Sequence, residues 1–252
     1  MKALLRHVLY WATPVLEPVL WSLASPGDTR TAHRARHLLV RRNQQQLDRF
    51  GPASLAEFDR RVALLGPGDV CLDLGANLGI FTEKLAATGA DVHAYEPDPH
   101  CFAQLQDRFA GRPNVHLHPK AVAATSGSFL LRRTRDFLDD PDLQSTSSSI
   151  AVDAPSIYDE TNAVMVETMA FHDVVRGLGK PVALVKMDIE GAEFGILDLL
   201  QQDREMGKNL PIGALFVETH ERHFPDRFPM VRDLRRAARA GQQPFLIDTF
   251  WP

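Results

Sequence analysis

Acidic side chains stand at the ends of four of the five strands that we expect in the central sheet of this chain. They are Asp73, Glu96, Asp188 and Glu218, and His220 follows two residues after the last of them. In open α/β sheets, ligands bind outside the carboxyl ends of the strands. Carboxylates at such an edge can accept hydrogen bonds from hydroxyl groups or hold a cation, and a histidine can take up a proton near neutral pH. The pattern predicts a polar, acidic site on one edge of the sheet.

A glycine turn follows the first of these strands, which we expect over residues 70–74. The segment 73–79 reads Asp-Leu-Gly-Ala-Asn-Leu-Gly, and its two glycines allow a tight turn that brings the backbone close to a ligand. A helix over residues 80–88 would then direct its N-terminus at that ligand. A strand, a glycine turn and a helix in this order form the nucleotide-binding unit of α/β sheets.

The spacing of these glycines argues against a dinucleotide and favours S-adenosylmethionine. The dinucleotide fingerprint has three glycines in the pattern G-x-G-x-x-G, whereas this turn has two in D-x-G-x-x-x-G. Asp73 suits a ligand with positive charge, and S-adenosylmethionine carries an amino group and a sulfonium. Glu96 lies 23 residues after Asp73, at the end of the second expected strand. That offset is close to the ~20 residues expected for an acid that binds the ribose.

Methyl transfer from a sulfonium to a hydroxyl requires alignment of the reacting atoms and removal of the hydroxyl proton. We expect His220 to be the base, because its ordinary pKa of about 6.5 suits neutral pH, and Asp188 is the rival base. A second hypothesis is a divalent ion held by Asp188, Glu190 and Glu218 or His220, where carboxylate ligands favour Mg²⁺. A structural interpretation stays open beside these, since acids here can also stabilise the N-terminus of the following helix.

Two motifs resemble those of the FkbM family of S-adenosylmethionine-dependent methyltransferases. They are the turn at 73–79 and the segment 186–193, Lys-Met-Asp-Ile-Glu-Gly-Ala-Glu, and the segments 95–97 and 216–220 fit the same pattern. The resemblance covers about residues 69–222, and it implies a Rossmann-like methyltransferase fold and O-methylation. No antiparallel seventh strand is evident after Phe250, which is a departure from the usual fold. Lys120-Ala121-Val122 also replaces the acid that often follows the third strand.

The resemblance implies that the turn lies against the methionine part of the cofactor and that Glu96 holds its ribose. Backbone amides near Ala121 would meet the adenine, and Asp188 would lie beside the methyl donor or the acceptor. The full set of residues that we expect to bind the cofactor is Asp73, Gly75, Ala76, Asn77, Gly79, Glu96, Ala121 and Asp188.

The expected elements alternate between strands and helices, which predicts an α/β protein with a largely parallel sheet. The fold class is a Rossmann-like class I methyltransferase fold with flanking helices and an N-terminal helical extension. We assign residues 1–50 to that extension and residues 51–252 to the S-adenosylmethionine-binding methyltransferase domain. The extension is aromatic and basic, with eight Lys or Arg and three acids. Its apolar stretch is too interrupted to span a bilayer.

Three interpretations of the extension stay open: packing helices, an amphipathic arm on a membrane surface, and a dimerisation element that would make a homo-oligomer. The net charge of the whole chain is −4, so no general attraction to nucleic acid follows. Cys71 and Cys101 are the only cysteines, which indicates buried thiols in a reducing compartment. We therefore expect a cytoplasmic protein, peripheral at the membrane surface if the arm binds lipid.

The leading functional hypothesis is an O-methyltransferase that acts on a hydroxyl of a sugar, a glycolipid or a secondary metabolite. The acceptor would be a small molecule or a glycan, lipid-linked if residues 1–50 contact a membrane. An N- or carboxyl-methyltransferase and a non-catalytic cofactor-binding scaffold of the same fold are the alternatives. The missing third glycine disfavours an NAD-type oxidoreductase. Residues 136–157, which include the serine run 145–149, are a linker or a mobile loop near the site.

Overall fold

A six-stranded parallel sheet forms the centre of the computed structural model, which describes residues 20, 23, 29–145, 148–151 and 158–251. Every neighbouring pair of strands in this sheet is parallel. In spatial order the strands are β3 (Val115–His118), β2 (Asp91–Tyr95), β1 (Val70–Leu74), β7 (Leu184–Met187), β8 (Ala214–Val217) and β9 (Leu246–Asp248). The expected parallel α/β fold is confirmed, and among the described residues this sheet has no antiparallel strand.

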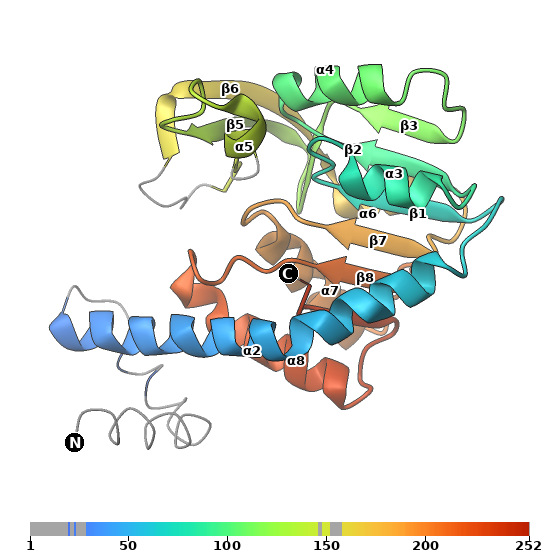
Figure 1. The fold of residues 1–252 in the computed structure, drawn as a ribbon. Helices are drawn as coiled ribbons and strands as arrows, with labels where there is room; N and C mark the ends of the chain where they lie inside the picture. The colour runs from blue at the N-terminus through green and yellow to red at the C-terminus, as the bar shows by residue number, and fades with distance from the viewer. Residues whose placement is uncertain (1–19, 21–22, 24–28, 146–147, 152–157, 252) are drawn as a thin grey trace.

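Helices cover both faces of this sheet (Figure 1). Side chains of a strand alternate between faces, so Leu72 and Leu74 join one apolar cluster while Cys71 joins another. The first face packs against α6 (Phe171–Gly177), α7 (Glu193–Glu205) and α8 (Phe228–Arg239). The second packs against α2 (Arg30–Val62), α3 (Ile80–Ala86) and α4 (Pro99–Arg108). Because both faces are covered, β1, β7 and β8 are buried along their whole length.

The helix α2 has 33 residues and is the longest helix in the described part of the chain. It runs unbroken from Arg30, after a cap in which the Thr29 hydroxyl accepts a hydrogen bond from the amide of Ala32. Pro52 lies inside this helix, and the expected domain boundary after residue 50 therefore falls within one continuous element. The apolar residues of the extension before residue 29 lie outside the described residues, except Leu20 and Leu23. Contact with a membrane and formation of an oligomer stay predictions.

No helix among the described residues has the length and apolar character needed to cross a membrane. Both cysteines are buried and free, as expected, and burial raises the pKa of each thiol to about 12. A thiol with so high a pKa is a poor nucleophile.

A small second sheet lies on the side to which the strands of the large sheet point (Figure 1). Its order is β4 (Ala121–Ala123), β6 (Tyr158–Ala170) and β5 (Gly127–Thr134). β5 and β6 pair antiparallel. The expected loop over 136–157 contains the short helix α5 (Pro141–Gln144), and its residues 146–147 and 152–157 lie outside the described residues.

Trp251 anchors the C-terminal segment against the second face of the sheet. Its side chain is 1% exposed, and its ring centroid lies 4.4 Å from that of Phe58 and 5.1 Å from that of Phe81. We expect Trp251→Ala to lower the free energy of unfolding by about 3–5 kcal/mol, because a large buried aromatic ring is lost and a cavity remains. Urea denaturation measures this. Leu64→Ala, at a side chain 72% exposed, is the control, and an equal loss in the two variants would contradict the anchoring role.

Candidate active site

A cleft opens at the carboxyl ends of β1, β2 and β7, between the large sheet and the small one. Its volume is about 910 Å³ when the space open to solvent is included. The cleft is lined by residues 75–78, 80, 81, 95–97, 121, 122, 131, 145, 148, 150, 186 and 188–190. One cavity therefore joins the glycine turn, the end of β2 and the acidic segment after β7.

The glycine turn contains positive φ angles and a close backbone contact, which few residue types other than glycine can adopt. Gly75 has a φ of +76°, and a Cβ at this position would lie 1.8 Å from the backbone oxygen of Asp188. Asn77 also has positive φ, at 49°, which asparagine accepts more readily than most residues. Its backbone amide points at the end of β2. Gly75 can thus pack directly against the backbone of Asp188, while the amide of Asn77 donates a hydrogen bond to a carboxylate at the end of β2.

That carboxylate belongs to Glu96, which is buried with 6% of its surface exposed. Its two oxygens accept hydrogen bonds from the amides of Asn77, at 2.7 Å, and Asp98, at 2.8 Å. Burial raises the pKa of Glu96 to about 7, although the two amide hydrogen bonds oppose the rise. Each carboxylate oxygen still has a lone pair free for a ligand hydroxyl.

Lys186 is a site residue that our sequence analysis did not single out. It lies in the middle of the sheet, 3% exposed, and its Nζ donates a hydrogen bond to the carbonyl oxygen of Gly75 at 2.7 Å. The same Nζ lies 3.4 Å from Asp73 and 3.9 Å from Asp188. Burial would lower the pKa of Lys186, but the neighbouring carboxylates, Asp73 first, leave it raised. The signal in the sequence is a lysine inside an apolar strand, since a buried charge needs partners.

Of the eight residues expected to bind a cofactor, six line the cleft: Gly75, Ala76, Asn77, Glu96, Ala121 and Asp188. Asp73 does not, because its side chain is fully buried below the turn, where it accepts a hydrogen bond from the Thr82 hydroxyl at 2.6 Å. Gly79 does not line the cleft either. A Cβ there would lie 2.6 Å from the ring of Phe109, so this glycine lets α4 pack against the turn.

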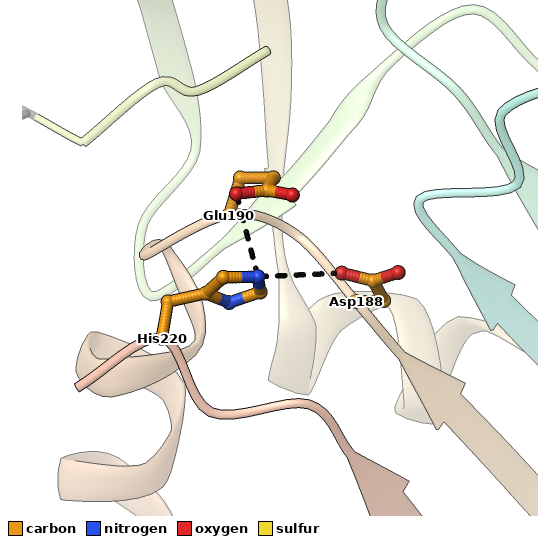
Figure 2. A group of neighbouring side chains, drawn as sticks. All are labelled: Asp188, Glu190 and His220. Atoms are coloured by element: carbon orange, nitrogen blue, oxygen red, sulfur yellow. Dashed lines mark ion pairs between the residues drawn. The ribbon is translucent and has the colours of Figure 1, made fainter. Parts of the chain in front are cut away.

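His220 lies behind the acidic end of the cleft and is 1% exposed (Figure 2). Its Nε2 lies 3.3 Å from Glu190 and 3.8 Å from Asp188, and both of these acids line the cleft. Glu218 lies 3.7 Å from the same nitrogen. The structure thus brings together all four residues that the sequence hypothesis assigned to catalysis or to metal binding.

The charges in this cluster alter the titration of its members. Burial lowers the pKa of His220, but the carboxylates of Glu193 and Glu190 outweigh it and raise the value well above 6.5. The pKa of Glu218 rises to about 7, mainly by burial and then by the charge of Asp188. This direction favours the protonated form of His220, whereas its expected role as a base was argued from the ordinary pKa of a histidine.

The parallel sheet, the glycine turn at the end of β1 and the acid at the end of β2 define a Rossmann-like class I methyltransferase fold. The chain matches the model of the methyltransferase FkbM domain over residues 73–242, which is more than half of its length. It therefore belongs to the FkbM methyltransferase domain family and carries a methyltransferase domain. The resemblance inferred from the motifs is confirmed.

Individual relatives match only parts of the chain. The ribosomal RNA small subunit methyltransferase A of Moorella thermoacetica is 38% identical over 96 residues, 38% of this chain and 33% of its own length. The 31-O-demethyl-FK506 methyltransferase FkbM of Streptomyces tacrolimicus is 47% identical over 55 residues, 19% of this chain and 21% of its own. A glycopeptide N-methyltransferase MtfA structure with sinefungin is 19% identical with a TM-score of 0.22, covering 51% of this chain and 74% of that one. The chain thus spans a third or less of the two curated relatives.

Proposed function

We propose that this protein is an S-adenosylmethionine-dependent O-methyltransferase that acts on a hydroxyl of a sugar, a glycolipid or a secondary metabolite. The observation that carries the proposal is that one continuous cleft connects the turn and Glu96 to the acids Asp188 and Glu190. A methyl donor bound along the turn would have its sulfonium near these acids. An acceptor hydroxyl would enter from the acidic end.

Different residues that line the cleft would bind different parts of the cofactor. Gly75, Ala76 and Asn77 would lie along its methionine part, and Glu96 would accept hydrogen bonds from the ribose hydroxyls. Backbone at Ala121 would meet the adenine. Asp73 and Gly79 would support the turn without touching the cofactor. Asp73 would do so through its ion pair with Lys186, and Gly79 by letting α4 pack closely against the turn.

The proposed reaction is an in-line displacement. The acceptor oxygen forms a bond to the methyl carbon while the bond from that carbon to sulfur breaks, and S-adenosylhomocysteine leaves. Alignment of these three atoms supplies much of the rate. The acceptor proton passes to a base, for which we choose Asp188 because its carboxylate lines the cleft and is 31% exposed. His220, buried behind it, would position the acids instead.

We expect cofactor affinity to depend on pH through Glu96. Its pKa is about 7 in the free protein, and hydroxyl donors on the ribose favour the carboxylate form and lower that pKa. Binding is therefore weaker where Glu96 is protonated, by about tenfold at pH 6 relative to pH 8. Titration calorimetry with S-adenosylhomocysteine measures this, and Glu96→Gln should weaken binding and remove the pH dependence. An affinity that is constant from pH 6 to pH 8 in the unaltered protein would contradict the ribose contact.

The raised pKa of Glu96 makes the stability of the free protein change with pH in the opposite direction to the cofactor affinity. The pKa of Glu96 in the folded protein lies above its ordinary value of 4.5, so the folded state binds the proton more tightly than the unfolded state does. Stability contributed by this proton is present below pH 4.5 and is lost as the pH rises through 7. Bound cofactor would offset that loss.

The experiment that tests the proposed function is transfer of a labelled methyl group from S-adenosylmethionine to a panel of glycans, glycolipids and polyhydroxylated metabolites. Amines, carboxylic acids and ribosomal RNA serve as the competing acceptor classes. Label on a hydroxyl supports the proposal. Label on nitrogen, on a carboxylate or on RNA would replace it, and cofactor binding with no transfer to any class would favour a non-catalytic scaffold.

A further inference from the structure

We propose that Asp188, Glu190 and His220 bind a divalent cation at the acidic end of the cleft. The meaning of this site for methyl transfer rests on the proposed function, whereas the binding of the cation does not. Each of the three residues offers one ligand atom, and these atoms all lie within 4.8 Å of one another. Two ligands of one cation, each about 2.1 Å from it, lie roughly 3–4 Å apart. The separations from Nε2, 3.3 Å to Glu190 and 3.8 Å to Asp188, suit this geometry.

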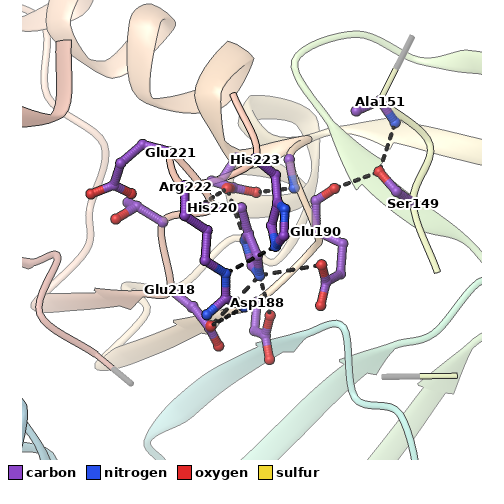
Figure 3. Close-up of polar contacts among 12 residues, drawn as sticks. Ser149, Ala151, Asp188, Glu190, Glu218, His220, Glu221, Arg222 and His223 are labelled. Atoms are coloured by element: carbon purple, nitrogen blue, oxygen red, sulfur yellow. Dashed lines mark hydrogen bonds and ion pairs between the residues drawn. The ribbon is translucent and has the colours of Figure 1, made fainter. Parts of the chain in front are cut away.

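The second observation is the nitrogen at the centre of the cluster. His220 Nε2 is buried and makes no hydrogen bond of acceptable geometry, although the side chain is 99% buried and faces the acids (Figure 3). A buried polar atom without a well-formed hydrogen bond is costly. Its position between carboxylate oxygens gives it a natural partner in a cation that the oxygens also bind.

The other side of the imidazole ring is held in the way that metal-binding histidines usually are. Glu193 Oε1 lies 3.1 Å from His220 Nδ1 and also accepts the backbone amide of His220 at 3.0 Å. Glu193 is itself fully buried, and its second oxygen accepts the amide of Gly191 at 2.7 Å. A carboxylate in this position fixes the ring and keeps the proton on Nδ1, which leaves Nε2 free to be a ligand.

The ligand set indicates which cations fit. Mg²⁺ prefers oxygen ligands throughout, whereas an imidazole nitrogen shifts preference toward Mn²⁺ or Zn²⁺. Glu218, 3.7 Å from Nε2, stands beside the group as a further oxygen donor. Asp188 and Glu190 line the cleft, so a cation between them would face an acceptor hydroxyl. Bound to that hydroxyl it would lower the hydroxyl's pKa, and the released proton would pass to Asp188 or to solvent.

The test uses the full chain, treated with a chelator and then titrated with Mn²⁺, which electron paramagnetic resonance detects. We expect about one bound equivalent, with a nitrogen coupling in the spectrum of the bound ion. His220→Ala should remove that coupling and weaken binding at least ~10-fold, and Glu193→Gln should weaken it about 10–100-fold. His172→Ala is the matched control, because His172 Nε2 pairs with Asp203 at 2.6 Å outside the cleft. It should leave Mn²⁺ binding unchanged.

A parallel titration of every variant with S-adenosylhomocysteine reports folding and keeps the two proposals apart. Mn²⁺ binding without cofactor binding would support the cation site and overturn the proposed function. Cofactor binding without Mn²⁺ would overturn the cation site alone, since the carboxylates would then only balance an imidazolium. Equal Mn²⁺ affinity in the unaltered protein and in folded His220→Ala would overturn it as well.

Discussion

Gly75→Ala is expected to abolish cofactor binding and to destabilise the fold by more than about 4 kcal/mol, a loss reserved for severe local disruption. The added Cβ would lie 1.8 Å from the backbone oxygen of Asp188, and real Cβ atoms essentially never come within 3.0 Å of an atom beyond their own residue and its chain neighbours. The obstacle is backbone, so no side chain can rotate away. The residue also has a φ of +76°, which alanine disfavours. Either β1 moves away from β7 or the turn changes shape, and a displacement of about 1 Å can cost ~100-fold in function.

Circular dichroism and urea denaturation measure the folding part of this prediction, and calorimetry with S-adenosylhomocysteine measures the binding part. Gly66→Ala is the matched control, because its Cβ would meet no atom within 4 Å and its φ is not in the left-handed region. The control should match the unaltered protein in both measurements. A folded Gly75→Ala variant with unchanged affinity would show that the turn does not need glycine.

The placement of the glycine turn beside Glu96 could be predicted from sequence because it depends on local patterns and on one strand pairing. Parallel pairing sets Leu74 opposite Tyr95, so the residues that follow them, Gly75 and Glu96, must be neighbours. The glycines reveal the turn, and the spacing to the acid reveals the second strand end. Backbone geometry and one pairing register were sufficient for this part.

The acidic end of the cleft depends on contacts between distant segments, which the periodicity of apolar residues in the sequence does not indicate. Glu193 and His220 meet across 27 residues of chain, because the N-terminus of α7 lies beside the loop after β8. The burial of His220 and the nearby carboxylate of Glu193, which raises its pKa against the effect of that burial, both follow from this packing. The unbroken course of α2 across the boundary expected after residue 50 also depends on packing, because Ala35 and Leu39 pack against Phe228 at the start of α8.

Lys186→Met is expected to lower the free energy of unfolding by about 3–5 kcal/mol, the usual cost of leaving one partner of a buried ion pair without the other. Lys186 is 3% exposed and Asp73 is fully buried. One oxygen of Asp73 accepts the Thr82 hydroxyl, while Oδ1 makes no hydrogen bond and has only the charge of Lys186 at 3.4 Å. Lys120→Met is the control. Its pair with Glu167 is exposed, and such pairs contribute about 0–1 kcal/mol.

A double-mutant cycle separates the charge from the packing. Asp73→Asn removes the carboxylate charge that Lys186→Met leaves without a partner, and the asparagine oxygen can still accept the hydrogen bond from Thr82. The double variant should therefore lose about 0.5–3 kcal/mol less unfolding free energy than the sum of the losses in the two single variants. Strict additivity, measured by urea denaturation, would contradict the pairing. The regained stability should come without regained cofactor affinity, because the hydrogen bond from Lys186 to the Gly75 carbonyl is absent in both variants. That divergence would show that the lysine has two roles, one balancing a buried charge and one holding the turn in its binding shape.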